Sequence, residues 1–372
     1  MSPAPDNSGR PRLREAGIAP GFYPPGPLNA ITDVQGVAVG QVTVWHGEGR
    51  LVVGKGPART GVTAIVPRDG NLVERPVEAA SWVFNGAGTS TGLHNIDEYG
   101  LLETPIVLTN TMSVGTAYTA LTRWCVNRCL PDPGRRGWFA PVVGETCDAF
   151  LNDIYGFHVT EEHVIQALDK AAGGPVAEGC VGAGTGIRTC GFKAGIGTAS
   201  RIITYEGREF TLGVLVQANL PGCLVVDGAP VGRELGMIDP EYSAGTGGSI
   251  MVVIATDLPL DSRQLRRTAA RAAFGLALAG ANGSHRSGDF VIAFSTTRRN
   301  EAASSPGLFY PARTLGDEYH LTKAFQAAAE ATQEAILNSV FKAVTVTGRD
   351  GNTCEALDLN KTAEILKKYG KL

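Results

Sequence analysis

Apolar positions along the chain follow two different periods. Short runs in which apolar or small residues dominate predict strands, because a strand that is covered on both faces is apolar throughout. The predicted strands cover 36–45, 61–68, 104–111, 139–146, 210–219, 249–257 and 288–296. The pattern therefore predicts sheets that are buried on both faces.

Four longer segments repeat apolar residues at helical spacing instead. They cover 113–130, 160–172, 261–280 and 319–344. Ser113 and Thr160 stand at N-cap positions of the first two segments, and Asp261 or Ser262 caps the third. Strands that alternate with pairs of long helices predict a layered α/β architecture with helices covering the sheets. No linker interrupts residues 1–372, so we expect a single domain.

Two segments follow neither period. The first 30 residues are polar and rich in proline and arginine, and they predict a poorly ordered arm. Residues 220–248 carry three prolines and many glycines, and they predict a long loop. A structureless connection of that length inside a compact domain is usually functional or disordered.

Composition narrows the possible functions. The net charge of −3 gives no sign of the clustered basic face that binds nucleic acid. No apolar run approaches the roughly 18 residues of a membrane span, and the N-terminus lacks the apolar core of a secretory signal. Seven scattered cysteines predict reduced thiols. We therefore expect a cytoplasmic protein without nucleic-acid or membrane partners.

Neither a metal nor a nucleotide site is indicated. Cys125 and Cys129 would share one helix face, but without a second pair of ligands they predict core packing. The chain has 48 glycines, and the glycine-rich stretches GAGTGI (182–187) and GTGGS (245–249) lack the further glycine or lysine of nucleotide-binding loops. They predict tight turns, so no cofactor is expected.

The stretch SAGTGGSIMVVIATD (243–257) places Ser249 between glycines and a predicted strand. In the simplest interpretation, Ser249 is a polar residue that begins a buried strand. None of the six histidines accompanies a G-x-S-x-G elbow, although triads can also assemble from distant positions. If the chain were cut before Ser249, the serine would gain a free α-amine with a pKa of about 7.7–8.0. Such an amine can act as the base for an N-terminal hydroxyl nucleophile.

The surrounding sequence suits such a cut. The hydroxyl of Ser249 can attack the carbonyl carbon of Gly248 and form an ester, which water then hydrolyses. Gly247 and Gly248 tolerate strained backbone angles and leave that carbonyl unshielded. The loop before them supplies slack for the new ends, and the strand after them holds the serine. Together these features favour autocatalytic cleavage at Gly248–Ser249.

Six segments carry a resemblance to one family. They are GLLETPIVLTNTMSVG (100–115), PVVGETCDAFLNDI (141–154), GCVGAGTGIRTCGFKAGIGTASR (179–201), GVLVQAN (213–219), GGSIMVVIATDLPL (247–260) and HRSGDFVIAFST (285–296). With these matches spread over most of its length, the chain resembles the L-aminopeptidase/D-esterase family, which includes the β-peptidyl aminopeptidases.

The resemblance implies a fold, a processing step and a substrate class. The fold is a four-layer αββα sandwich, similar to N-terminal nucleophile hydrolases but connected differently. Cleavage would give fragments 1–248 and 249–372, which stay together as a heterodimer and assemble into larger oligomers. Substrates are short peptides, amides or esters with a free amine, of L-, D- or β-amino acids. The family uses no metal or cofactor.

The resemblance also implies catalytic roles for individual residues. Ser249 matches the nucleophile, and Ser287 and Asp289 in RSGDF match the pair that lies next to it. Without the family, Ser287 would equally be a turn residue beside Gly288. Asn219, at the end of VLVQAN, matches the amide that donates to the oxyanion, although an asparagine there could also cap a loop.

Further matches concern substrate binding. Glu145 in PVVGET resembles the carboxylate that binds the substrate ammonium, and Asp148, Asn152 and Asp153 are alternatives or helix caps. Cys147 stands where relatives carry a larger residue, which would widen the pocket. Thr89 also departs from the family, because an acidic residue is usual there; this departure leaves the substrate preference open.

Two other functions remain open from the sequence. One is an acyltransferase of the kind that includes ornithine acetyltransferases, whose nucleophile is normally threonine; the serine here counts against it. The other is a non-enzymatic protein that binds a small molecule in a glycine-lined pocket.

Overall fold

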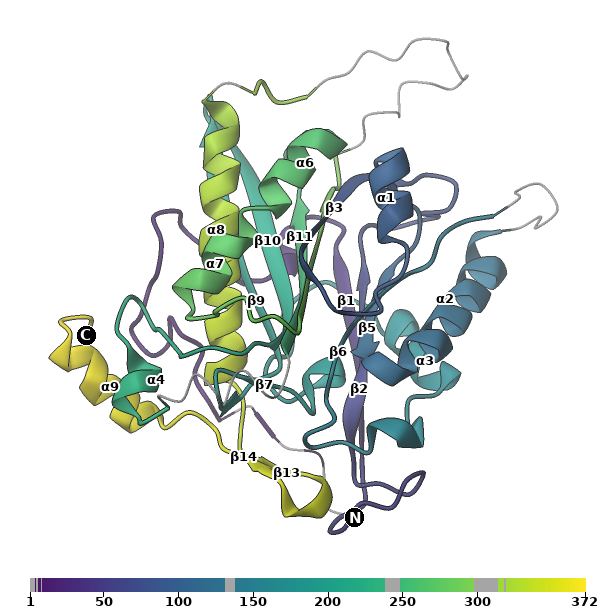
Figure 1. The fold of residues 1–372 in the computed structure, drawn as a ribbon. Helices are drawn as coiled ribbons and strands as arrows, with labels where there is room; N and C mark the ends of the chain where they lie inside the picture. The colour runs from purple at the N-terminus through teal and green to yellow at the C-terminus, as the bar shows by residue number, and fades with distance from the viewer. Residues whose placement is uncertain are drawn as a thin grey trace.

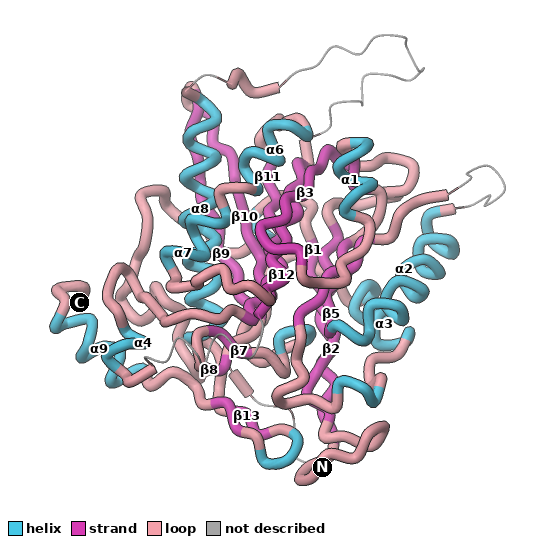
Figure 2. Tube along the Cα trace, in the orientation of Figure 1, coloured by secondary structure: helices cyan, strands magenta, loops and turns pink. Residues whose placement is uncertain are grey.

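Two sheets lie face to face at the centre of the molecule, and a layer of helices covers the outer face of each (Figures 1 and 2). The computed structural model describes residues 4, 6–7, 9–130, 138–237, 248–297, 314–317 and 319–372. The arrangement confirms the four-layer αββα sandwich. Among the described residues, no helix is both long enough and apolar enough to cross a membrane.

The smaller sheet has four strands in the order β1-β2-β5-β6. They are β1 (Ala38–His46), β2 (Ala58–Val66), β5 (Ile106–Asn110) and β6 (Val142–Thr146). β5 and β6 run parallel, so their carboxyl ends reach the same edge of the sheet. Polar residues that end or follow these two strands are thereby brought together.

The larger sheet has six strands in the order β4-β3-β12-β11-β10-β9. They are β4 (Leu101–Leu102), β3 (Val77–Gly86), β12 (Ser287–Ser295), β11 (Gly248–Thr256), β10 (Arg208–Asn219) and β9 (Ile196–Tyr205). β11 and β12 are parallel neighbours at its centre. Two short ribbons complete the strands, β7 (Arg188–Thr189) with β8 (Phe192–Lys193), and β13 (Val346–Thr347) with β14 (Thr353–Cys354).

Helices α2 (Val114–Cys129) and α3 (Glu161–Asp169) cover the four-stranded sheet. On the other side, α6 (Ser262–Ala269), α7 (Ala272–Leu278) and α8 (His320–Phe341) form the layer over the six-stranded sheet (Figure 1). The shorter helices are α1 (Leu93–Tyr99), α4 (Val231–Glu234) and α9 (Leu359–Lys368).

Side chains of β11 alternate between two cores, as strand geometry requires. Met251, Val253 and Ala255 pack between the two sheets. Ile250 and Val252 pack outward against the helical layer. Both faces of the strand are therefore apolar, and this explains the uninterrupted apolar run in the sequence. Cys125 and Cys129 are buried under α2, as predicted.

The predicted helix over 261–280 is divided in two. Asp261 caps α6 as expected, because its carboxylate accepts the backbone N–H of Gln264 at 2.8 Å. Ala270 and Arg271 keep helical backbone angles but form a turn that separates α6 from α7. In α7, Gly275 approaches α8 so closely that a Cβ there would lie 2.6 Å from the carbonyl oxygen of Ala329. The α7 segment therefore packs tightly against α8.

The prediction of a poorly ordered N-terminal arm was wrong for much of that segment. Leu13 is fully buried, and Arg12 forms an ion pair of 2.6 Å with Glu178. Arg14 pairs with Glu334 of α8 at 2.8 Å. Polar composition suggested an arm, but Arg12 and Arg14 are held by carboxylates from distant parts of the chain.

The predicted loop over 220–248 is also more structured than expected, as far as it is described. Residues 220–237 include α4, and Leu224 and Val226 are fully buried. Gly222 forms a bridge with Ala281. The part of the loop over 238–247 lies outside the described residues.

Candidate active site

Ser249 is the second residue of β11, where the central strand of the larger sheet begins. Ser249 and Met251 are two residues apart in the strand, so their side chains lie on the same face, toward the smaller sheet. The residue is 5% exposed and lines a pocket of about 330 Å³. A nucleophile in this position is held by strand pairing on both sides.

Asn219 is the last residue of β10 and stands directly opposite Ser249 in the antiparallel register. Its Nδ2 donates to the hydroxyl oxygen of Ser249 at 3.3 Å and to the carbonyl oxygen of Cys147 at 3.1 Å. Its Oδ1 accepts the backbone N–H of Arg188 at 3.2 Å. These bonds fix the orientation of the amide, so that its NH2 group, and not its oxygen, faces the serine.

Glu145 reaches the same pocket from the opposite sheet, near the carboxyl end of β6. It is 3% exposed, and its Oε1 accepts the backbone N–H of Thr89 at 3.0 Å. The hydroxyl of Thr111 donates to Oε2. Both oxygens accept from neutral donors, so the carboxyl group is oriented without a cationic partner among the groups that donate to it.

Close backbone approach builds the wall around Glu145. A Cβ at Gly88 would lie 2.9 Å from Oε1 of Glu145 and 2.6 Å from the ring of Phe290. A Cβ at Gly144 would lie 2.5 Å from Cε of Met251. Glycine at these two positions therefore lets the loop after β3, and strand β6, approach the larger sheet.

The pocket combines apolar and charged groups. Its further lining residues are Ala87, Gly88, Thr111, Met112, Cys147, Ala149, Ile154, Tyr155, Gly248 and Arg286. No histidine is among the described residues that line it. Tyr155 is 63% exposed and stands at the rim. The sequence identified Glu145, Cys147, Gly248 and Ser249 here, but it assigned no role to the other lining residues, including Arg286, the first residue of RSGDF.

Cys147 lines the pocket beside the nucleophile candidate. Although its side chain reaches solvent, the pocket walls limit its hydration and, with the carboxyl groups of Asp148 and Glu145, raise the pKa of the thiol. A thiol with a raised pKa forms less of the reactive thiolate at neutral pH. The geometry therefore favours Cys147 as part of the wall.

Ser287 and Asp289 lie on β12, the parallel neighbour of β11. Ser287 is paired in register with Gly248, and its hydroxyl donates to Oδ1 of Asp289 at 2.6 Å. Nδ2 of Asn85 donates to Oδ2 at 2.8 Å. Burial raises the pKa of Asp289, and these two bonds act against that rise. Ser287 thus lies beside Gly248 and Asp289 lies beside Ile250, while the Ser249 hydroxyl bonds to Asn219.

The alternative carboxylates near Glu145 are engaged elsewhere. Asp148 is buried and accepts from Nδ2 of Asn152 at 3.0 Å. Asp153 is within 2.9 Å of the His158 ring and accepts the backbone N–H of Gly54 at 2.8 Å. None of these side chains is among the pocket-lining residues, so Glu145 is the carboxylate available to a ligand.

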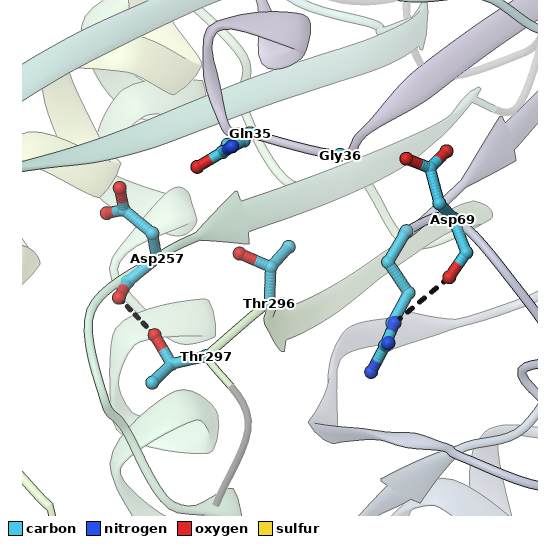
Figure 3. A pocket seen from close by; sticks show the side chains of 7 residues that line it. Gln35, Gly36, Asp69, Asp257, Thr296 and Thr297 are labelled. Atoms are coloured by element: carbon cyan, nitrogen blue, oxygen red, sulfur yellow. Dashed lines mark hydrogen bonds between the residues drawn. The ribbon is translucent and has the colours of Figure 1, made fainter. Parts of the chain in front are cut away.

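A larger pocket, of about 520 Å³, lies at the other end of the central strands (Figure 3). Asp257 follows the last residue of β11, roughly 25 Å from Ser249 at the rise of a strand. Its carbonyl accepts from the hydroxyl of Thr297, and Arg68 donates to the carbonyl of Asp69 at 3.2 Å. The lining side chains offer no nucleophile paired with a base. Among the described residues, no cluster of histidine, cysteine and carboxylate groups is arranged to hold a metal ion.

The sequence and fold match one peptidase family. The model of peptidase family S58 matches residues 29–354. The chain is 46% identical, over 97% of its length and 93% of the relative, to the β-peptidyl aminopeptidase BapA of Sphingosinicella microcystinivorans. It is 40% identical to the BapA of Sphingosinicella xenopeptidilytica, over 96% of this chain and 91% of that one.

A solved structure of an aminopeptidase is also similar to this chain. The L-aminopeptidase D-Ala-esterase/amidase of Ochrobactrum anthropi is 42% identical, with a TM-score of 0.88 over 98% of this chain and all of that one. That protein is described as a prototype of the serine aminopeptidases and a variant of the Ntn hydrolase fold. The fold of this chain thus matches that of a protein described as a serine aminopeptidase.

The chain belongs to peptidase family S58. It is an enzyme, and its function is that of an aminopeptidase. The acyltransferase and the non-enzymatic binding protein, which the sequence had left open, are thereby disfavoured.

Proposed function

We propose that this aminopeptidase cleaves its own chain at Gly248–Ser249 and then uses Ser249 as an N-terminal nucleophile, with its own α-amine as the base. The observation that carries the proposal is the contact of 3.3 Å between Asn219 and the Ser249 hydroxyl, in a pocket whose described lining contains a carboxylate but no histidine. The substrates are short peptides, amides or esters with a free amine.

The first step is intramolecular. The hydroxyl oxygen of Ser249 attacks the carbonyl carbon of Gly248, the peptide C–N bond breaks, and an ester joins the two residues. Water hydrolyses the ester, leaving a carboxylate on Gly248 and a free amine on Ser249. Ser287, which is in register with Gly248, and Asp289, which accepts the Ser287 hydroxyl, would hold the new amine in place.

In catalysis the amine accepts the proton of the Ser249 hydroxyl while the oxygen attacks the substrate carbonyl. Asn219 donates to the oxyanion that forms, a contribution worth about 2.7–4 kcal/mol for a preorganised donor. The protonated amine then gives its proton to the leaving nitrogen, and water hydrolyses the acyl-enzyme. Glu145 binds the substrate ammonium, and Cys147 forms part of the pocket wall.

The two fragments would remain one folded unit. β11 and β12 belong to the smaller fragment, and in the larger sheet they are paired with β10 and β3 of the larger one. Separation would break both ladders and expose two faces of apolar strands. We therefore expect a heterodimer that resists dilution, and we extend this expectation to a larger assembly of such heterodimers.

Intact mass spectrometry tests the proposal directly. The purified protein should give two masses, with Ser249 first in the smaller fragment, and should hydrolyse aminoacyl p-nitroanilides of L-, D- or β-amino acids. Ser249→Ala should give one uncut, inactive chain. Ser262→Ala, at the start of α6, is the matched control and should be cut and active. Cleavage of Ser249→Ala at the same bond, or brisk hydrolysis by an intact wild-type chain, would show that the proposal is wrong.

A further inference from the structure

Arg286 is the one cationic side chain among the described residues that line the serine pocket. It is exposed and immediately precedes β12. It makes no hydrogen bond or ion pair with another described residue. Arg201, by contrast, is fully buried and paired with Glu330 and Glu334. Arg286 is thus a charge that projects into a concave site without a partner from the described chain.

The two charges of the pocket come from opposite sheets. Glu145 lies on β6, across the intersheet space from β11. Arg286 immediately precedes β12 of the larger sheet, where Ser287 pairs in register with Gly248. The strand that carries Ser249 therefore has the carboxylate on the sheet facing it and the guanidinium at the start of its neighbour in the same sheet.

A molecule with opposite charges at its two ends matches this arrangement. In a free dipeptide, the ammonium and the carboxylate lie on either side of the single peptide bond, about 7 Å apart in an extended chain. The pocket volume of about 330 Å³ is at the small end of ligand sites, so it suits a short substrate. A longer peptide would move its carboxylate outward by about 3.5 Å for each added residue.

We propose that Arg286 binds the free carboxylate of the leaving residue, and that the preferred substrates are dipeptides with both termini free. This inference rests on the proposed roles of Ser249 and Glu145. The planar guanidinium can donate two parallel N–H groups to a carboxylate, which a neutral C-terminal amide accepts less well. The ammonium at Glu145 and the carboxylate at Arg286 together place the scissile carbonyl at Ser249.

The test compares two substrates that differ in one group. A dipeptide with a free carboxylate and the same dipeptide with a C-terminal amide are assayed with the wild-type enzyme, Arg286→Gln and Arg286→Lys. We expect the wild-type kcat/KM to favour the acid by about 10–100-fold, the range for a hydrogen-bonded charge. In Arg286→Gln this ratio should fall to near 1 through a higher KM for the acid, and Arg286→Lys should restore part of it.

Two controls separate this effect from other causes. Arg208→Gln makes the same change of charge at the start of β10, the opposite end of that strand from Asn219, and should keep the wild-type ratio. Intact mass confirms that each variant is cut to the same extent before rates are compared. The inference about Arg286 would be wrong if Arg286→Gln kept the wild-type ratio of kcat/KM for acid over amide, or if the wild-type enzyme did not prefer the acid. Neither result would contradict the proposed function. If the wild-type enzyme hydrolyses none of the aminoacyl substrates, the proposed function is itself wrong.

Discussion

The side-chain amide of Asn219 and the hydroxyl of Ser249 meet across neighbouring strands, with 3.3 Å between nitrogen and oxygen. Their antiparallel register makes them direct partners, although they are 30 residues apart in the chain. The same nitrogen is held by the carbonyl of Cys147, so the donor is oriented before any substrate binds. Preorganised donors of this kind stabilise a developing oxyanion.

Replacing Asn219 should therefore lower kcat more than it changes KM. Asn219→Asp keeps an oxygen to accept the backbone N–H of Arg188 but loses the donor, and Asn219→Ala loses both. We expect kcat to fall by about 10²–10³-fold in each variant. Single-turnover kinetics on fully cut protein measures this. A fall of less than threefold in Asn219→Ala would exclude an oxyanion role.

Gly88 offers a test of the Glu145 site that leaves the carboxylate itself unchanged. A methyl group at Gly88 would lie 2.9 Å from Oε1 of Glu145 and 2.6 Å from the Phe290 ring, so one of them must move. Gly88→Ala should raise KM for substrates with a free amine about tenfold, with a smaller change in kcat. Gly86→Ala is the matched control, because the nearest atom to its Cβ is 3.7 Å away. Equal KM values for the two variants would contradict the ammonium site.

The sequence predicted the strands of the site well, because a strand buried on both faces leaves a plain apolar signal. It could not predict which strand ends meet. The pairing of Asn219 with Ser249, and of Ser287 with Gly248, is set by register between segments that are distant in the chain. The roles of these residues came from the family resemblance, and their juxtaposition came from the fold.

The wrong predictions share a cause. The N-terminal segment appeared disordered because it is polar, yet Arg12 and Arg14 are paired with Glu178 and Glu334. Arg286 had no role assigned from the sequence either, although it opens the RSGDF motif. In each case the partner or pocket around the side chain is assembled by tertiary contacts, which local patterns do not encode.

If Ser249 gains a free amine as proposed, Asp289 should tune the protonation of that amine. A nearby carboxylate favours the charged form of an amine, so removal of the carboxylate should lower the pKa of the amine. Since the amine must be deprotonated to act as a base, the acid limb of the pH profile of kcat/KM should move to lower pH in Asp289→Asn.

Ser287→Ala should lower kcat by about 10–100-fold. The double variant with Ser287→Ala and Asp289→Asn should be little worse than the less active of the two single variants.

The control for this prediction is a buried carboxyl at the far end of the same strands. Burial also raises the pKa of Asp257, which follows β11 roughly 25 Å from Ser249. Asp257→Asn should leave the acid limb where it is in the wild-type enzyme. A pH–rate profile that is identical in Asp289→Asn and wild type would show that Asp289 has no charge coupling to the amine.

Asp148 should make the stability of the fold depend on pH. Burial raises its pKa from 3.8 to about 7, against opposing hydrogen bonds from Thr60 and Asn152, and its Oδ2 has no partner among the described residues. Because the folded pKa is the higher one, the folded chain binds the proton more tightly. The resulting stabilisation is complete below about pH 4 and is lost as the pH rises through about 7.

Asp148→Asn cannot ionise, so it should escape that loss. We expect the free energy of unfolding of the variant, relative to its parent, to improve by about 2 kcal/mol between pH 5 and pH 8. Urea unfolding in the Ser249→Ala background keeps one uncut chain in both proteins. Glu178, whose pKa burial also raises to about 7, is present in both and cancels in the difference. The prediction is wrong if the difference in free energy of unfolding between the variant and its parent is the same at pH 5 and pH 8. Asp148 would then be charged in the folded chain at pH 5, and a group other than its own proton would have to stabilise the unpartnered Oδ2.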